Sequence, residues 1–322
     1  MGTVIMGEYE IVPYRPSNFC RCAALLRTLW SRDQEERQKY FEWKYHNNPY
    51  TETSLGIVAL HGDKVVGFRG YCATPWQAQG KDIMALMVGD TIVESAHRRR
   101  GLSMKMGMLA CEEYVSDYKF LLNMEANRKA APGYLKLGFH PLLDKRMQVS
   151  FAKMDKAGIE NVAVSDKPDL QRTHQPVTDK IILRSDSEFF NWRYKSNLPY
   201  KYKFYYHNQD YIIIGQLPKN DIAHILDYTE NDISSFEILL KCIRHTPSIV
   251  TLSIRTMNLS ETVSSVLKKL KFKDNNIKNR LIVPILVRPT APNPTEEDWF
   301  LNGLDMRDIN NWELKGICSE WA

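Results

Sequence analysis

The chain of 322 residues lacks the features that mark membrane, metal and nucleic-acid proteins. Its longest apolar runs, such as Leu281–Val287, are as long as a strand and far too short to span a bilayer, so no membrane partner is expected. Six cysteines are scattered, and the closest pair, Cys20 and Cys22, is one residue too short for Cys-x-x-Cys; no metal is expected. The net charge of +5 forms no long basic stripe interleaved with aromatic residues, which argues against a nucleic-acid partner.

The N-terminal segment also lacks the apolar core and cleavage site of a secretory signal peptide, so a reducing cytoplasm is the expected location. What is present is ordinary for a globular protein. Hydrophobic residues make up 43% of the chain and charged residues 25%. A chain of this length can form two domains with sizeable cores.

The sequence repeats itself. The segment 41–50, Phe-x-Trp-x-Tyr followed by Asn-Pro-Tyr, recurs at 190–200 with one residue inserted. Four shorter landmarks recur in the same order: 64–67 and 212–215, 90–91 and 227–228, 134–139 and 267–272, 146–149 and 280–283. Five landmarks in one order predict a tandem duplication. The residues between the copies show no hydrophobic periodicity. We therefore expect a first domain at 1–154, a linker at 155–178, a second domain at 179–288 and a C-terminal arm at 289–322 that docks on the body.

The first copy has a readable order of elements. Alternating or apolar runs predict strands at 8–14, 54–61, 64–73, 83–93 and 120–124. Helical patterns cover 18–30, 34–44, 102–118 and 127–137. Hairpins come first and strand–helix–strand units follow, which predicts an α/β fold of mixed α+β character.

One turn is the most informative part of the chain. The predicted strand Ile83–Val93 passes through an arginine-rich turn into the predicted helix Leu102–Tyr118. Unpaired N–H groups at a helix start, together with the helix dipole, form an anion site from the main chain. Gly101 and the small Ser103 would let a diphosphate approach closely. The alternative is a solvated charge run at a helix start. The candidate cofactor residues here are Val93, Arg98, Arg99, Arg100, Gly101, Leu102 and Ser103.

These residues resemble a known motif. Val93-x-x-x-x-Arg98-x-x-Gly101-x-Ser103 is similar to the acetyl-CoA pyrophosphate motif of the GNAT superfamily of N-acetyltransferases, Gln/Arg-x-x-Gly-x-Gly/Ala. The run His97–Leu102 resembles the enhanced-intracellular-survival type of tandem acetyltransferase. Downstream, Asn127-x-x-Ala130-x-x-x-Tyr134, followed by Leu-Gly-Phe, is similar to the second family signature. Ser103 stands where the family has Gly or Ala.

The resemblance implies two tandem GNAT-like domains, each a mostly antiparallel twisted sheet flanked by helices. Acetyl-CoA is the implied co-substrate, bound by the turn and by Asn127. Its pantetheine arm would lie where strand Met87–Val93 splays from strand Phe120–Met124. In the second copy, Tyr228-Thr-Glu230-Asn-Asp232 replaces the arginine turn, and two carboxylates there would repel a diphosphate. We expect that copy to be a degenerate, supporting domain.

The resemblance also implies roles in catalysis. Tyr134 is the expected acid that protonates the leaving thiolate, because a phenol and a thiol have reference pKa values of about 10 and 8.5. Its alternative role is to pack beside Phe139. Asp90, a lone charge among apolar neighbours, is the candidate base, with Glu94 and Glu125 as other candidates. The alternative for Asp90 is a structural aspartate, which its recurrence as Asp227 favours.

An aromatic pair is open to two interpretations. In the GNAT layout the segment that contains Trp43 and Tyr45 forms the acceptor wall, so both are candidate substrate-wall residues. Their recurrence as Trp192 and Tyr194 in the copy without the turn favours core packing instead.

We expect an acetyl-CoA-dependent N-acetyltransferase that acts on a primary amine of a small molecule, with an amino sugar as first guess. The alternatives are a peptide or protein N-acetyltransferase, an aminoacyl-tRNA-dependent ligase, which fits poorly, and a non-catalytic CoA-binding module. The sequence leaves open whether the chain forms a homo-oligomer.

Overall fold

The computed structural model describes residues 2–30, 33–124, 126, 129–143, 148–150, 161–172, 178–195, 201–216, 222–246, 249–255, 259–274 and 285–318. The chain divides into two compact units. Unit 1 consists of Met1–Leu143, Thr178–Leu183 and Pro284–Asn311, and unit 2 of Asp144–Val177, Arg184–Val283 and Trp312–Ala322. Each unit contains its own sheet, so each is described by itself.

Unit 1 is built on a twisted, mostly antiparallel sheet with the strand order β1-β2-β3-β4-β5-β6-β16-β7, and β10 pairs with the far end of β4. Among the neighbouring strands of this order that the structure describes, β5 and β6 run parallel and the others antiparallel. The strands are β1 (Val4–Met6), β2 (Tyr9–Pro13), β3 (Gly56–His61), β4 (Lys64–Ala78), β5 (Lys81–Val93), β6 (Phe120–Asn123), β7 (His140–Leu143), β10 (Ile181–Leu183) and β16 (Ile285–Pro289). A separate hairpin joins β17 (Phe300–Leu301) to β18 (Leu304–Asp305).

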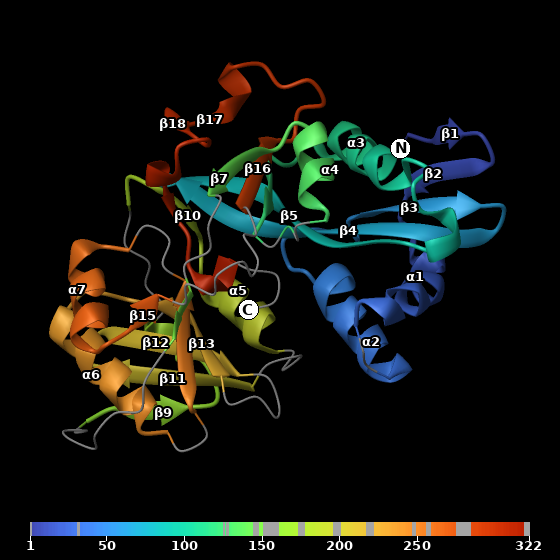
Figure 1. Ribbon diagram of the computed structural model, residues 1–322. Coiled ribbons are helices and arrows are strands. Elements are labelled where there is room, and N and C mark those ends of the chain that lie inside the picture. Colours follow the sequence, from blue (N-terminus) through green and yellow to red (C-terminus); the bar gives the residue numbers. More distant parts are fainter. Residues whose placement is uncertain are drawn as a thin grey trace. The chain divides into compact units, whose positions relative to one another are not determined.

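Helices cover both faces of this sheet, and Figure 1 shows α3 and α4 on one face and α1 and α2 on the other. The helices are α1 (Phe19–Leu25), α2 (Gln34–Phe41), α3 (Leu102–Tyr114) and α4 (Ala131–Lys136). Shorter helical turns are η1 (Pro16–Asn18), η2 (Leu26–Thr28), the π-helical η3 (Glu42–His46), η4 (Ser95–His97), η6 (Glu297–Trp299) and η7 (Ile309–Asn311). The main core lies under α3, where Leu102, Met106 and Leu109 pack on the sheet.

Unit 2 repeats the plan with a sheet in the order β15-β8-β14-β13-β12-β11-β9, in which only β13 and β14 are parallel. The strands of this sheet are β8 (Gln148–Ser150), β9 (Ala163–Ser165), β11 (Lys201–His207), β12 (Asp210–Gln216), β13 (Ile222–Tyr228), β14 (Thr251–Arg255) and β15 (Lys273–Asp274). The short β19 (Trp312–Glu313) pairs with β10 and is not part of this sheet. The helical elements of unit 2 are α5 (Ser187–Lys195), α6 (Ile233–Arg244), α7 (Glu261–Lys269), η5 (Leu170–Arg172) and η8 (Gly316–Cys318). Helices α6 and α7 bury their apolar faces in its core.

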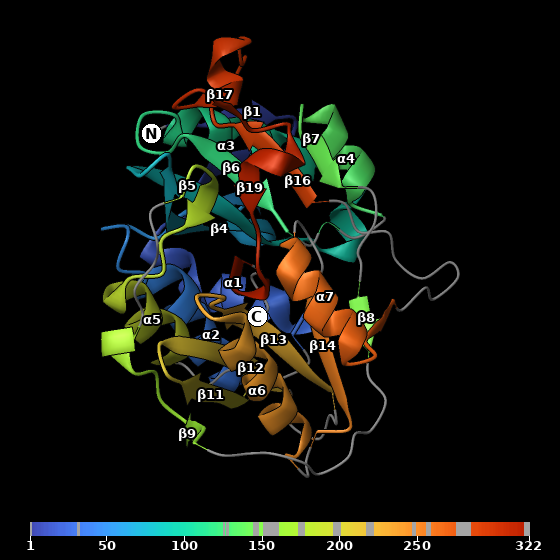
Figure 2. The ribbon, with the colours of Figure 1, turned by 90° about the vertical axis from the view of Figure 1, so that its left-hand side faces the viewer.

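The two repeats exchange one strand. Strand β16, near the end of the second repeat, lies between β6 and β7 in the sheet of unit 1. Strand β8, near the end of the first repeat, lies between β14 and β15 in the sheet of unit 2. Figure 2 shows β8 beside β14, and β16 near β6 and β7. Neither unit is therefore one continuous stretch of sequence.

This exchange differs from the domain boundaries expected from the sequence, 1–154 and 179–288. Residues 178–183 and 284–311 join unit 1, because β10 and β16 find hydrogen-bonding partners there. The expected linker, 155–178, contains β9, which pairs with β11. The expected arm, 289–322, divides at Trp312, with the earlier part in unit 1 and the later part in unit 2.

The expected fold class, an α/β protein of two tandem GNAT-like units, is confirmed. The expected strand 64–73 extends to Ala78, and the helix expected at 102–118 ends at Tyr114. Among the helices that the structure describes, none is long and apolar enough to cross a membrane.

Candidate active site

The arginine-rich turn connects the end of β5 to α3. A single helical turn, η4, follows the strand, and Arg99 and Gly101 then adopt positive φ values of 63° and 76°. Gly101 is the N-cap of α3 in the left-handed region, with no side-chain cap. A Cβ added to Gly101 would meet nothing within 4 Å. The glycine is therefore required by its backbone conformation, and the space in front of it is open.

The main-chain amides of this turn are available to a ligand. Within the part of the chain that the structure describes, the N–H groups of residues 99–104 have no hydrogen-bond partner in the protein. The first helical bond is donated by the Lys105 N–H to the Gly101 carbonyl oxygen, at 3.1 Å. These amides lie at the positive end of the α3 dipole. They form a site suited to an anion.

The three arginines of the turn have different surroundings. The Arg98 Nε donates to the Val93 carbonyl oxygen at 2.9 Å. The Arg100 Nη1 lies 3.0 Å from a carboxylate oxygen of Glu8, so its charge is already paired. Among the described residues, Arg99 has no ion pair. The guanidinium groups of Arg98 and Arg99 therefore remain available to an anion near the open amides.

The corresponding turn of unit 2 is closed by its own carboxylates. At the start of α6, Asp210 accepts hydrogen bonds from the Asn231 and Asp232 N–H groups, both at 2.9 Å. Asp232 is the N-cap and accepts from the Ser234 and Ser235 N–H groups. Four amides that correspond to open ones at α3 are thus occupied. The start of α6 offers no comparable anion site.

The parallel strands of unit 1 diverge beside the turn. Strand β5 pairs with β6 only at Leu86 and Met87, which face Leu121 and Leu122. Beyond this point β5 continues to Val93 and pairs only with β4. Among the described residues, the edge of β5 that follows Met87 thus has no second neighbouring strand, as the resemblance implies for the pantetheine arm.

Tyr134 lies in α4 and is 6% exposed. Its ring packs edge-on against Phe139, with centroids 5.1 Å apart, and the Arg69 guanidinium lies 4.8 Å from the ring centroid. Within the described residues, the Tyr134 hydroxyl makes no hydrogen bond. A held ring with an unengaged hydroxyl suits proton donation to a ligand.

Asp90 is engaged in a buried cluster. Its carboxylate accepts hydrogen bonds from the Trp30 Nε1 at 2.8 Å, the Lys44 Nζ at 2.9 Å and the Tyr45 hydroxyl at 2.7 Å. Asp90 is 4% exposed and Lys44 is 2% exposed. Burial raises the pKa of Tyr45 well above its ordinary value, and the Asp90 charge adds to this shift. These contacts favour the structural alternative for Asp90 over the role of a base. Another candidate base, Glu94, is paired with Lys64.

Trp43 and Tyr45 pack into the protein. Tyr45 is 2% exposed and lies against Gly70, where an added Cβ would come within 2.4 Å of the Tyr45 ring. Trp43 is 9% exposed and packs on Tyr40. These positions favour the core-packing interpretation over a substrate wall.

Two expected site residues, Asn127 and Glu125, lie outside the described residues. Two residues that matter here were not predicted from the sequence, Arg69 beside Tyr134 and Asp210 at the start of α6. A signal exists for Arg69, because it is a lone cation in the otherwise apolar part of β4. Within the described chain, no group of three or more His, Cys, Asp or Glu residues could hold a metal ion.

Comparison with known proteins identifies one domain in the first repeat. Residues 10–142 match the family model of an acetyltransferase (GNAT) domain. No curated protein matches the chain.

Several solved structures share the fold. A GCN5-related N-acetyltransferase from Kribbella flavida has a TM-score of 0.66 at 11% identity, over 88% of this chain and 71% of that one. Eis1 from Mycobacterium abscessus has a TM-score of 0.51 at 11% identity, over 76% and 64%. A tandem GNAT protein from the clavulanic acid biosynthesis pathway has a TM-score of 0.51 at 13% identity, over 90% of this chain and all of that one. At these identities the likeness establishes the fold.

Residues 10–142 thus form an acetyltransferase (GNAT) domain, which lies in the first repeat and contains the motif. The chain also shares the fold of a tandem GNAT protein, which agrees with the resemblance that its sequence indicated.

Proposed function

We propose that unit 1 transfers an acetyl group from acetyl-CoA to a primary amine of a small molecule, with amino sugars as the first acceptors to test. The turn after β5 would hold the diphosphate of the co-substrate. Arg98, Arg99, Gly101, Leu102 and Ser103 would contribute amides or guanidinium groups, and binding energy at the diphosphate would position the distant thioester.

The observation that supports this proposal most strongly is the contrast between two helix starts of one chain. The amides of residues 99–104 are open at α3, whereas Asp210 and Asp232 occupy the amides at the start of α6. At the start of α6, two carboxylates would repel an anionic ligand. At the start of α3, no carboxylate of the described residues occupies the amides, so an anion could bind them. Only the first repeat would therefore bind the co-substrate, and the second would support it.

Acetyl transfer would take place beside β5, at a distance from the turn that holds the diphosphate. The pantetheine arm would pair with the strand edge beyond Met87, which lacks a neighbouring strand. The amine lone pair would attack the thioester carbonyl, and the C–S bond would break as the tetrahedral intermediate collapses. The Tyr134 hydroxyl would give its proton to the departing thiolate. The proton of the amine would leave through solvent, since both Asp90 and Glu94 are paired.

The test is acetyl-CoA consumption by the full chain, measured as release of free thiol, with amino sugars, polyamines and peptides as acceptors. Turnover with an amino sugar supports the proposal, and turnover with peptides alone would redirect it to a peptide N-acetyltransferase. Tyr134→Phe should lower kcat by about 10²- to 10⁴-fold, the range of general acid catalysis, with the CoA Kd unchanged. CoA binding without turnover on any acceptor would instead indicate a non-catalytic module.

A further inference from the structure

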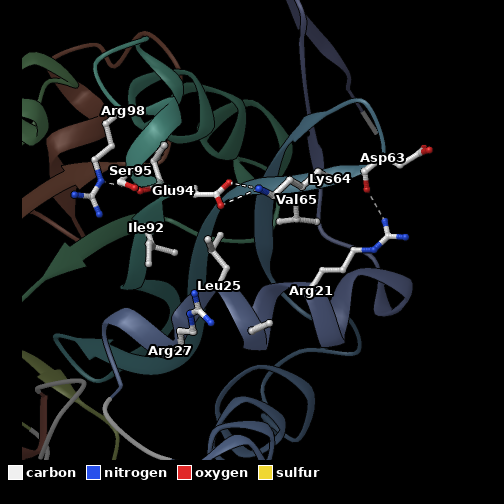
Figure 3. Close-up of a pocket in the computed structure, with 12 residues that line it drawn as sticks. Arg21, Leu25, Arg27, Asp63, Lys64, Val65, Ile92, Glu94, Ser95 and Arg98 are labelled. Atoms are coloured by element: carbon white, nitrogen blue, oxygen red, sulfur yellow. Dashed lines mark hydrogen bonds and ion pairs between the residues drawn. The ribbon is translucent and has the colours of Figure 1, made fainter.

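A cavity of about 650 Å³ lies beside the end of β5 in unit 1. It is bounded by α1 and η2, by the hairpin between β3 and β4, and by residues 92–95, the end of β5 with the start of the turn that follows. Figure 3 shows the side chains that line it. Small-molecule sites commonly have volumes of about 300–1,000 Å³, so the cavity has the size of a ligand site.

The charges around this cavity are unbalanced. Four cations line it, Arg21, Arg27, Lys64 and Arg98, against two carboxylates. The Glu94 carboxylate is already paired with the Lys64 Nζ at 2.7 Å, and the Lys64 hydrogen bond holds the pKa of Glu94 below its usual range.

Within the described chain, the arginines that line this cavity form no ion pair with a carboxylate. Arg21 donates to the Asp63 carbonyl oxygen at 2.8 Å, a main-chain contact that leaves its charge unpaired, and the Asp63 side chain points away from the other labelled side chains (Figure 3). Among the described residues, Arg27 and Arg98 likewise have no ion pair with a carboxylate. Arg98 is assigned above to the diphosphate, so Arg21 and Arg27 are the two guanidinium groups that remain for a second ligand of negative charge in this cavity.

The position of the cavity relates it to the reaction proposed above. It adjoins Ile92 and Val93, the last residues of the β5 edge that β6 leaves unpaired. It is walled by α1, which covers the face of the sheet opposite α3 (Figure 1). The open amides begin at Arg99 and are not part of its lining. A molecule in the cavity would therefore lie beside the path of the pantetheine arm without competing for the amides at the start of α3.

We propose that this cavity binds a phosphate or carboxylate group of the acceptor, so that the enzyme selects amines that also carry a negative charge. This proposal rests on the proposed acetyl transfer for the role of the ligand. The anion site itself does not depend on that activity, because its charges and volume are properties of unit 1 alone.

The binding test uses the full chain saturated with CoA, so that the amides at α3 are filled, and inorganic phosphate as the probe in a ³¹P NMR titration. Arg27→Gln and Arg21→Gln should each raise the phosphate Kd by about tenfold, the loss expected for one hydrogen bond from a charged donor. Arg15→Gln, an exposed arginine outside the cavity, is the matched control and should leave the Kd unchanged. No phosphate binding, or binding that Arg27→Gln leaves unaltered, overturns the site.

A kinetic test identifies the source of the anion. Glucosamine 6-phosphate should have a higher kcat/KM than glucosamine in the wild type. In Arg27→Gln the ratio of the two kcat/KM values should fall about tenfold, because the KM for glucosamine 6-phosphate rises. An equal preference in both proteins overturns the assignment to the acceptor, and so does a CoA Kd weakened by Arg27→Gln, because the cavity would then hold a phosphate of the co-substrate. If neither amine is acetylated while phosphate binding still depends on Arg27, the proposed function fails and the anion site stands.

Discussion

The turn at Gly101 offers the sharpest test of the co-substrate site. Gly101→Asp places a carboxylate in front of the open amides, whereas Gly101→Asn places a neutral side chain of nearly the same shape there. Both residues tolerate the left-handed conformation better than other side chains do, so they share the cost of a φ of 76°. The difference between the two variants therefore isolates the effect of charge.

The magnitude follows from the position of the added charge. A carboxylate about 4 Å from a phosphate is repelled by about 1 kcal/mol per pair of unit charges in water and by about 4 kcal/mol at an effective dielectric constant of 20. Gly101 is exposed, so the lower value applies, and a diphosphate with two charges gives about 2 kcal/mol. We expect Gly101→Asp to bind CoA about 30-fold more weakly than Gly101→Asn.

Isothermal titration of CoA into each variant measures this difference, and added salt should reduce it. Gly303, with a φ of 89° in the β17–β18 hairpin and open space around it, provides the matched control. Gly303→Asp should lose stability in the same way as Gly101→Asp but keep the wild-type affinity for CoA. Equal CoA affinities for the Asp and Asn variants at position 101, with both proteins folded, would refute the assignment of this turn to the diphosphate.

Three further changes test the supporting structure. Asp90→Asn should lower the free energy of unfolding by about 3–5 kcal/mol, because it leaves the Lys44 charge buried and unpaired, whereas Lys39→Met, at an exposed ion pair, should scarcely change the denaturation midpoint. Unchanged stability together with lost turnover would instead make Asp90 the base. Glu230→Lys should leave CoA affinity unchanged by titration, since Asp210 still occupies the α6 amides; a second CoA site in this variant would contradict that reasoning. A chain that ends at residue 178 lacks β16 and should be insoluble or molten by circular dichroism, and a soluble, CoA-binding fragment would show that the exchanged strand is dispensable.

Local signals in the sequence were sufficient for much of unit 1. The apolar runs at 54–61 and 64–73 predicted β3 and β4, and the change from strand pattern to helix pattern around Gly101 predicted the turn. These features depend on residues close together in the chain, so their physics is visible in the sequence.

The exchanged strands could not be predicted in the same way. Ile285–Pro289 has the pattern of a last strand of the second repeat, and nothing local states that its partners are β6 and β7. Strand β9, within the expected linker, is only three residues long and exists through its pairing with β11. Both depend on contacts that are distant in sequence, where one strand pattern fits either sheet equally well.

The two repeats also explain why Asp90 looked like a catalytic residue. In unit 2 its counterpart Asp227 is equally buried and accepts a hydrogen bond from the Tyr211 hydroxyl at 2.9 Å, with the Lys315 Nζ 3.4 Å away. Burial raises the pKa of Asp227, and Lys315 opposes that rise. Each repeat thus holds an aspartate at the same place with a tyrosine and a lysine, although the lysine comes from a different part of the chain.

Both aspartates lie next to an irregularity in strand pairing. The register of β4 and β5 shifts between Arg69 and Tyr71, and that of β12 and β13 between Ile213 and Ile214. A bulge leaves main-chain groups without ladder partners, and a buried carboxylate held by a cation can fix the bent strand there. The frame is therefore common to both repeats, including its buried charge, and cannot account for a difference in ligand binding. The difference that we propose would then come from the helix start, where one copy keeps its amides open behind Gly101 and the other fills them with Asp210 and Asp232.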